Sequence, residues 1–204
     1  MLIVTYSLVT LSVEQEKTRH ILSTLQQRTQ DYATHPQRCD SRGLESILNQ
    51  FTQFDLACRQ RNVELYLIPA IRRATQEADS LLAELESFSS LGANALKSVR
   101  HHLQQDVELG VHKVKELAGT MGVYCHHLLA RLGREEQELF PVARRVITSE
   151  EDWFAIASQF ISHEAELHAY KPSQARHAPA GEESAQACLH FAARVSAPML
   201  QAHE

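Results

Sequence analysis

Apolar residues recur at intervals of three and four along most of this chain, which is the spacing that lines one face of an α-helix. The spacing is clearest in one stretch of the first half, at Leu44, Ile47, Leu48, Phe51, Phe54 and Cys58. Two further stripes of this kind lie between residues 81 and 91 and between residues 114 and 128. No stretch shows the alternation of apolar and polar residues that marks a strand. The pattern therefore predicts an all-α fold.

Start and stop signals divide this pattern into separate helices. Ser12 followed by Gln15 fits a capping box that opens a first helix. His35 ends it, because a residue that precedes a proline, here Pro36, disfavours the helical backbone. Residues 1–11 are expected to form a short extension that packs on the helices. The later helices are predicted over residues 44–69, 77–103, 114–145 and 148–170.

The connections between the four long helices are short. They predict an up-down-up-down four-helix bundle over residues 12–170, with one additional short helix at its end. Residues 171–181 contain two prolines and a glycine and are expected to form a linker. The Ala-rich residues 182–204 are predicted to form a C-terminal helical segment.

The composition narrows the functions that such a bundle can have. The chain has 204 residues and a formal net charge of −5, so it lacks the basic character that nucleic-acid binding requires. Its four cysteines form no Cys-x-x-Cys pair, and we interpret them as reduced thiols of a cytoplasmic protein. No apolar run approaches the roughly 18 residues of a membrane span. We expect neither a nucleic acid nor a membrane as partner. The expected partner is a protein or a small ligand, and a homodimer is a further option.

A fifteen-residue segment occurs twice, 72 positions apart. Residues 59–73 and 131–145 align without a gap and are identical at six positions, namely one glutamate, one leucine, one proline and three arginines. An internal repeat of this kind predicts one structural unit that is used twice. Two pairs should therefore occupy equivalent levels of the second and fourth helices, with the leucines buried: Pro69 with Pro141, and Leu67 with Leu139.

The second copy and the residues after it carry a family resemblance. Between Glu135 and Ile156 the chain reads Glu-Glu-Gln-Glu-Leu-Phe-Pro, and soon afterwards Thr-Ser-Glu-Glu-Asp-Trp. This resembles the bacterial hemerythrin-like (HHE cation-binding) proteins, and the resemblance is weaker but in register over about residues 12–170. It implies a four-helix bundle that holds two irons. The ligands in that family are one His on each of two helices and a His-x-x-x-Glu on each of the other two.

In this chain, the His-x-x-x-Glu positions mostly hold residues that cannot bind iron. They fall on Arg131 and Glu135 in the fourth helix, and on Arg59 and Val63 in the second. An arginine stays protonated and has no lone pair to offer a metal. Two arginines in the two symmetric positions therefore predict a degenerate member of the family that has lost its diiron centre and needs no cofactor.

The single-His positions also depart from the family pattern. They fall on Gln15 in the first helix, with His20 as the alternative if the register differs, and on Ser89 in the third. A rebuilt mononuclear iron site from His20, His127 and Glu135 is the alternative to complete loss of metal. His127, Arg131 and Glu135 share one helix face at a spacing of four residues.

A charge network is a physical replacement for the iron. The guanidinium groups of Arg59 and Arg131 could supply the positive charge of the lost metal to Glu64, Glu135 or Glu136, because a planar guanidinium binds carboxylates in a bidentate manner. The alternative is that both arginines lie at the surface and that only their aliphatic stems pack. A buried network requires close pairing, since unpaired buried charges are costly.

Three hypotheses for function follow from these patterns. The first is a binding or regulatory module that keeps the hemerythrin-like bundle without its metal centre. The second is a non-haem iron protein that binds or senses oxygen or nitric oxide through altered ligands. The third is an enzyme, such as a protein that repairs iron centres, and the sequence favours it least.

Overall fold

The computed structural model describes residues 2–38, 41–105 and 110–174, and every element within these ranges is helical. The all-α prediction is therefore confirmed. In chain order, the elements are α1 (Leu2–Thr34), the 3-10 turn η1 (Pro36–Arg38), α2 (Ser41–Cys58), the π-helix η2 (Val63–Leu67), α3 (Ile68–Ala74), α4 (Asp79–Gln105), α5 (Val111–Arg134), the π-helix η3 (Glu135–Leu139), α6 (Phe140–Val146) and α7 (Glu150–Gln174). None of the helices in these ranges combines the length and the apolar character that crossing a membrane requires.

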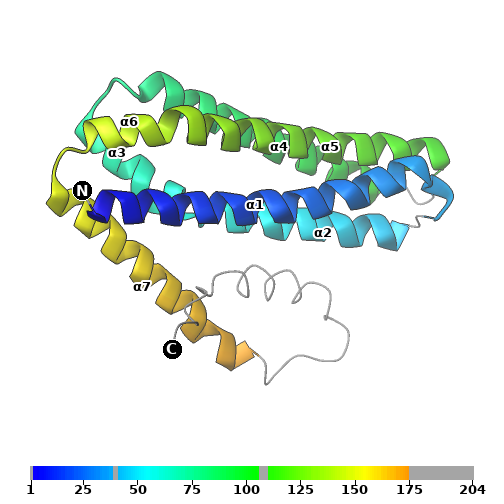
Figure 1. Ribbon diagram of the computed structural model, residues 1–204. Coiled ribbons are helices and arrows are strands. Elements are labelled where there is room, and N and C mark those ends of the chain that lie inside the picture. Colours follow the sequence, from blue (N-terminus) through cyan, green and yellow to red (C-terminus); the bar gives the residue numbers. More distant parts are fainter. Residues whose placement is uncertain (1, 39–40, 106–109, 175–204) are drawn as a thin grey trace, which may run out of the picture.

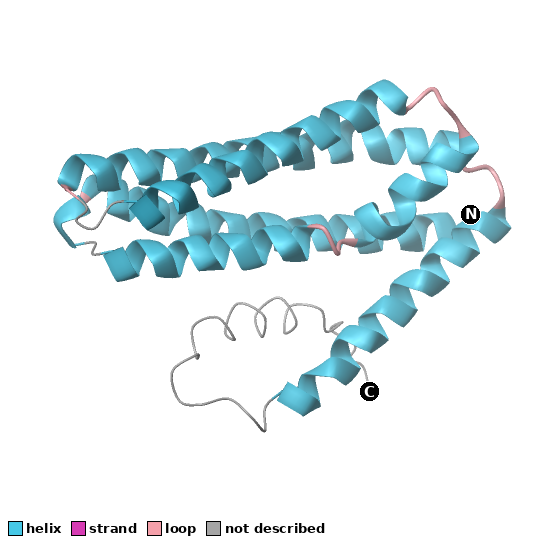
Figure 2. Cartoon of the chain, turned by 180° about the vertical axis from the view of Figure 1, so that it is seen from behind, coloured by secondary structure: helices cyan, strands magenta, loops and turns pink. Residues whose placement is uncertain are grey.

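Four columns of helix lie side by side (Figure 1, Figure 2). They consist of α1, of α2 with η2 and α3, of α4, and of α5 with η3 and α6. Both α1 and α4 pack against α2 and α5, so each column has two neighbours in a closed ring. The last helix, α7, begins near the N-terminal end of α1 and runs obliquely away from the columns, with contacts to α1 and η2.

Two apolar clusters fill the interior, and polar residues separate them along the columns. On α1, Leu11 belongs to one cluster and Leu22 to the other, with the buried Gln15 between them. On the fourth column, Leu132 and Leu139 belong to different clusters, with the buried Glu135 between them. The interior therefore has a polar layer at one level.

The first helix begins much earlier than the sequence predicts. Residues 2–11 form no separate extension, because α1 is continuous from Leu2. The Ser12 hydroxyl does not cap a helix start, since it donates to the Leu8 carbonyl oxygen at 3.0 Å inside the helix. Hydroxyl side chains can make this bond one turn back without ending a helix. Apolar contacts of the early turns, such as that of the fully buried Leu11, hold this stretch in place.

The second helix is interrupted where an unbroken one is predicted over residues 44–69. It ends at Cys58, a turn follows at residues 59–61, and helical structure resumes before Val63. At the other end of the chain, α7 continues to Gln174, past the predicted end near residue 170. The rest of the predicted linker and the segment 182–204 lie outside the described residues.

The repeat is visible in the backbone. The π-helices η2 and η3 occupy aligned positions of the two copies, and each leads into a short α-helix with proline in its first turn. Leu67 and Leu139 are both fully buried, as predicted. In a π-helix each N–H bonds five residues back instead of four, so the backbone is wider at the point where each proline follows.

Candidate functional site: a buried arginine–glutamate network

The centre of the polar layer is the carboxylate of Glu135, the first residue of η3. It is 0% exposed and accepts hydrogen bonds from three side chains on three different columns. An ionised carboxylate offers about four acceptor positions. A bare carboxylate at this depth would be costly, so its partners decide whether the site is stable.

Two arginines clamp Glu135 from opposite columns. Arg61 donates from Nη2 to Oε1 at 2.6 Å and from Nη1 to Oε2 at 3.0 Å, which is a bidentate pair. Arg131 lies one helical turn before Glu135 and donates from Nε to Oε1 at 2.9 Å. Each arginine is 5% exposed. Charge-assisted bonds of this geometry are stronger than neutral ones.

Three further residues complete the network. The amide of Gln15 on α1 donates to Glu135 Oε2 at 2.9 Å, so Glu135 accepts two bonds on each oxygen. Glu64 on η2 accepts one hydrogen bond from Arg131 and one from Arg61, the latter at 3.3 Å. Ser89 on α4 accepts from Arg131. All four columns therefore meet at this level.

The charges of the network stabilise one another. Burial alone would raise the pKa of Glu135, but the charge and hydrogen bonds of Arg61, and then those of Arg131, hold it below its usual range. Burial works to lower the pKa of Arg61, and Glu135 outweighs this effect and raises it. At neutral pH Glu135 and Arg61 are therefore ionised groups in contact.

The structure brings together most of the residues predicted for this level. Gln15, Ser89, Arg131 and Glu135 meet in the network, and Glu64 joins them. In this structure Arg131 lies in the buried arrangement, paired with Glu135, and not at the surface.

Three predicted residues lie elsewhere. The Arg59 side chain is 56% exposed and pairs with Asp55 at 3.2 Å, so Arg59 does not contact Glu135. Val63 is fully buried in an apolar cluster. Glu136 points outward and pairs with Arg19 at 2.9 Å. Arg59 lies outside the network because the chain turns after Cys58, and this turn places its side chain at the surface.

The residue that sequence reasoning missed is Arg61. A signal for it was present, because the apolar stripe through Phe54 and Cys58 continues to position 61 at an interval of three. The alignment of the repeat pointed to Arg59 instead, opposite Arg131. The spacing alone would not have placed Arg61, because residues 59–61 form a turn and not a helix.

The histidines proposed for a rebuilt metal site do not form one. Within the described ranges, no group of three or more His, Cys, Asp or Glu side chains is placed to hold a metal ion, and this covers His20, His127 and Glu135. His20 is exposed on α1. His127 lies beside Phe88, with 6.3 Å between the ring centroids, and its buried Nδ1 atom forms no hydrogen bond with the part of the chain that the structure describes.

A second carboxylate, Glu14, lies next to the network on α1. Its Oε1 atom accepts the backbone N–H of Asn62 at 2.9 Å, at the point where the second column resumes after its break. Its Oε2 atom is buried and has no hydrogen-bond partner among the described residues. Burial raises the pKa of Glu14 to about 7, against the opposing effects of the Asn62 bond and the charge of Arg61. Glu14 is therefore poised to change its charge near neutral pH.

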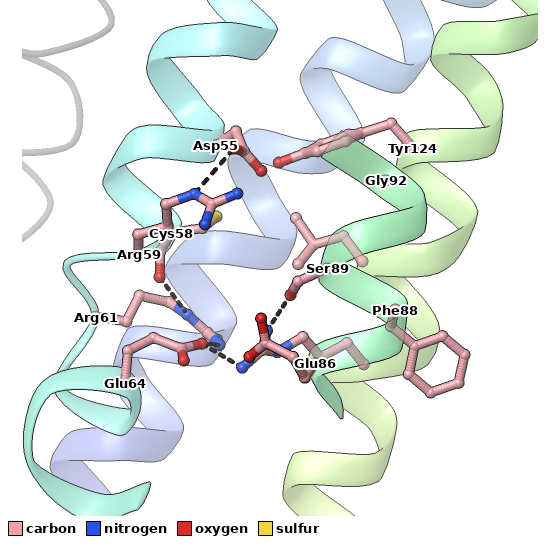
Figure 3. A pocket seen from close by; sticks show the side chains of 12 residues that line it. Asp55, Cys58, Arg59, Arg61, Glu64, Glu86, Phe88, Ser89, Gly92 and Tyr124 are labelled. Atoms are coloured by element: carbon pink, nitrogen blue, oxygen red, sulfur yellow. Dashed lines mark hydrogen bonds and ion pairs between the residues drawn. The ribbon is translucent and has the colours of Figure 1, made fainter. Parts of the chain in front are cut away.

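A cavity of about 200 Å³ adjoins the network between α2, α4 and α5 (Figure 3). Arg61, Glu64, Ser89 and Arg131 form the wall that it shares with the network. Its remaining lining consists of Asp55, Cys58, Arg59, Glu86, Phe88, Gly92, Tyr124 and Leu128. Burial raises the pKa of the Cys58 thiol to about 12, so this thiol remains protonated and is a weak nucleophile.

Comparison of the chain with protein-family models, with curated proteins and with solved structures finds no match. The resemblance to hemerythrin-like proteins thus remains a prediction that rests on the residues of this sequence.

Proposed function

We propose that this protein is a hemerythrin-like four-helix bundle that has lost its diiron centre and acts as a binding or regulatory module. The observation that carries the proposal is the fully buried Glu135 carboxylate between two arginines, at the level where the resemblance expects iron ligands. The two guanidinium groups supply the positive charge that a metal would otherwise bring to this level.

The hydrogen bonding of Glu135 supports this proposal. Glu135 accepts two bonds from Arg61, one from Arg131 and one from Gln15. These bonds fill the roughly four acceptor positions of a carboxylate. A metal would have to displace these donors, and a displaced guanidinium would remain as a buried charge beside it. The network thus competes with metal both for the ligand atoms and through its own positive charge.

The adjoining cavity supports a binding role. It reaches the same layer of the bundle as the network, and it shares Arg61, Glu64, Ser89 and Arg131 with it. A ligand in this cavity would contact side chains from several columns at once. Ligand binding could in this way change how the columns pack, which is what a regulatory module requires.

Metal analysis tests the loss of iron. The full chain, produced in iron-rich medium and purified without chelator, is expected to contain far less than one iron per chain by elemental analysis. Anaerobic addition of Fe(II) should leave the melting temperature unchanged, because a ligand that does not bind cannot stabilise the folded state. About two irons per chain, together with the absorption band of an oxo-bridged pair, would overturn the proposal.

A further inference from the structure

The N-terminal part of α1 carries an apolar line on its outer side. Four residues at intervals of four, three and four positions are each between 45% and 90% exposed, namely Leu2, Tyr6, Val9 and Val13. This spacing places them on one face of the helix, opposite the face that buries Leu11. No residue from Leu2 to Val13 is charged. A contiguous apolar line of this kind marks a surface that another element covers.

The sequence after α7 contains a segment with a matching apolar face. Residues 182–204 lie outside the described residues, but their sequence has the spacing of an amphipathic helix, with Pro198 as a stop signal. Apolar residues fall on one face, at Ala185, Cys188, Leu189, Ala192 and Val195. Polar residues fall on the opposite face, at Glu183, Gln186, His190 and Arg194. A helix of about fifteen residues is marginal in water by itself, so the apolar face of this segment needs a surface to pack on.

The course of α7 favours an antiparallel approach of this segment to α1. In Figure 1, α7 begins near the N-terminal end of α1 and runs obliquely away from it to Gln174. The chain that follows has to turn back to reach the apolar line of α1. Residues 175–181 can span roughly 23–25 Å when extended, which gives the chain the length for this turn. A segment that returns in this way runs opposite to α7 and to α1.

We infer that residues 182–197 dock as an antiparallel helix on the outer face of α1. The helical spacing sets the register, with Cys188 opposite Val13, Ala192 opposite Val9, and Val195 opposite Tyr6. Glu182 then comes beside Lys17, the first basic residue after the apolar line, while Glu16 falls on the other flank of α1. A parallel helix would instead place Cys188 near Leu2 and Glu182 away from Lys17. Charge complementarity thus favours the same direction as the course of α7.

A second copy of the chain is the competing occupant of this surface. A short linker holds the segment near α1 at an effective concentration of about millimolar, whereas a second copy has to come from solution. Pairing of α1 with α1 of a second copy would also leave the apolar face of residues 182–197 uncovered. The segment of the same chain is therefore the favoured occupant. This inference goes beyond the proposed function and does not depend on the loss of iron.

The native Cys188 makes the register testable by cross-linking in the full chain. Val13→Cys, treated with oxidised glutathione, should form a disulfide with Cys188, because the two positions face each other in this register. Leu2→Cys lies at the other end of the apolar line, and Ser12→Cys lies beside Val13 but off that line. Both should form the bond at least about tenfold more slowly, since a disulfide needs Cα atoms about 4.4–6.8 Å apart. Peptide mapping identifies the bond, and Cys188→Ser should abolish it.

The outcomes of this experiment separate the possible arrangements. Equal rates in the three variants would overturn the docking, because an undirected segment meets all three positions alike. Faster reaction of Leu2→Cys than of Val13→Cys would overturn the antiparallel register. A covalent dimer of Val13→Cys would show that a second copy covers this face, and it would overturn the inference as well.

Substitutions within the apolar line supply a second measurement. In the Val13→Cys chain, Val9→Glu should slow formation of the disulfide about tenfold, because it places a charge in an apolar contact. Ser12→Glu adds the same charge one turn away from that contact and should leave the rate unchanged. Val9 is 56% exposed, so the core does not depend on it, and circular dichroism should show an intact bundle. An unchanged rate with Val9→Glu would overturn the assignment of this surface.

Discussion

The two copies of the repeat build the same structure in their second parts and different structures in their first. From positions 63 and 135 onward, each forms a π-helix and then a short α-helix that begins with proline in its first turn. Before these positions, α5 runs without interruption into η3, whereas α2 stops at Cys58 and a turn follows. The same aligned arginine is therefore buried in one copy and exposed in the other.

The turn in the first copy exchanges one arginine for another. It leaves Arg59 outside, paired with Asp55, and directs Arg61 inward to Glu135. Arg61 also donates from Nε to the Cys58 carbonyl oxygen at 3.3 Å, which satisfies one carbonyl at the end of α2. The side chain thus stabilises the break that places it in the core.

The copies also differ in what they contribute to the network. The second copy supplies the central carboxylate, Glu135, while the aligned Val63 belongs to an apolar cluster. The aligned residues Glu64 and Glu136 also have different partners. Glu64 pairs with Arg131 in the network, and Glu136 pairs with Arg19 at the surface. Two copies of one unit have become complementary, because a single buried carboxylate needs counter-charges rather than a second carboxylate.

The largest expected effect compares the three arginines of the two copies. Arg61→Met and Arg131→Met should each lower the free energy of unfolding by roughly 3–5 kcal/mol, because each leaves buried carboxylate charge without its partner. Arg59→Met should change it by less than about 1 kcal/mol, since the Arg59 side chain is 56% exposed. Urea denaturation at pH 7 measures all three.

A double-mutant cycle sharpens this comparison. Arg131→Met combined with Glu135→Gln reports the coupling between the two side chains, and Arg61→Met with Glu135→Gln reports the second coupling. Both coupling energies should be clearly above zero. If Arg59→Met proved as destabilising as Arg61→Met, the exchange of arginines in the first copy would be refuted. A coupling near zero would mean that the apolar clusters hold the columns without help from the network.

Much of the fold follows from the sequence, because apolar spacing reports directly on the face that each helix buries. The stripe from Leu44 to Cys58 emerges in this way, whereas the alignment of the repeat predicts the buried Leu67 and Leu139 and the equivalence of the two copies after position 63. The local helix propensity does not predict that α2 ends at Cys58. The turn is bound to the core through Arg61 and Glu135, which lie 74 positions apart along the chain, and no local pattern encodes this contact.

The candidate site likewise contains residues that the sequence could place and features that it could not. Gln15, Ser89 and Glu135 could be placed from helical spacing and from the register that the hemerythrin-like resemblance implies, because each lies within an unbroken helix. Arg61 could not be placed by alignment, since its position depends on the turn. The cavity beside Tyr124 has no sequence signal, because it is a gap between three columns rather than a property of any one of them.

The next effect concerns Glu14, whose carboxylate binds the backbone where helical structure resumes in the first copy. Glu14 accepts the N–H of Asn62, whereas the aligned Arg134 lies inside α5 and needs no such partner. The folded protein raises the pKa of Glu14 from 4.5 to about 7, so between these pH values the folded state keeps a proton that the unfolded state has released. Stability should therefore fall as pH rises through this window, by up to about 3 kcal/mol.

Glu14→Gln is the matched test of this pH dependence. The amide oxygen can still accept from Asn62, but the side chain no longer titrates, so stability should be nearly flat between pH 5 and pH 7.5 by urea denaturation. Glu135 acts in the opposite direction, because its lowered pKa stabilises the folded state above pH 4.5 and this contribution is lost in more acidic solution. A wild-type curve that stays flat from pH 5 to pH 7.5 would contradict the assignment to Glu14.

The smallest effect tests where the two copies are alike. A proline inside an ordinary α-helix costs roughly 3 kcal/mol, because it removes a hydrogen bond and its ring clashes with the carbonyl four residues back. Pro69 and Pro141 each follow a π-helix whose closing N–H, from Ile68 or Phe140, bonds five residues back. The wider turn already accommodates the proline, so Pro69→Ala and Pro141→Ala should recover none of that cost. Each should instead destabilise by about 0.4–1 kcal/mol, through the greater freedom of the unfolded chain. Equal small losses in urea denaturation would support one shared unit. A gain of about 3 kcal/mol at either position would show that the π-helix there does not relieve the proline, and that the two copies differ in this part as well.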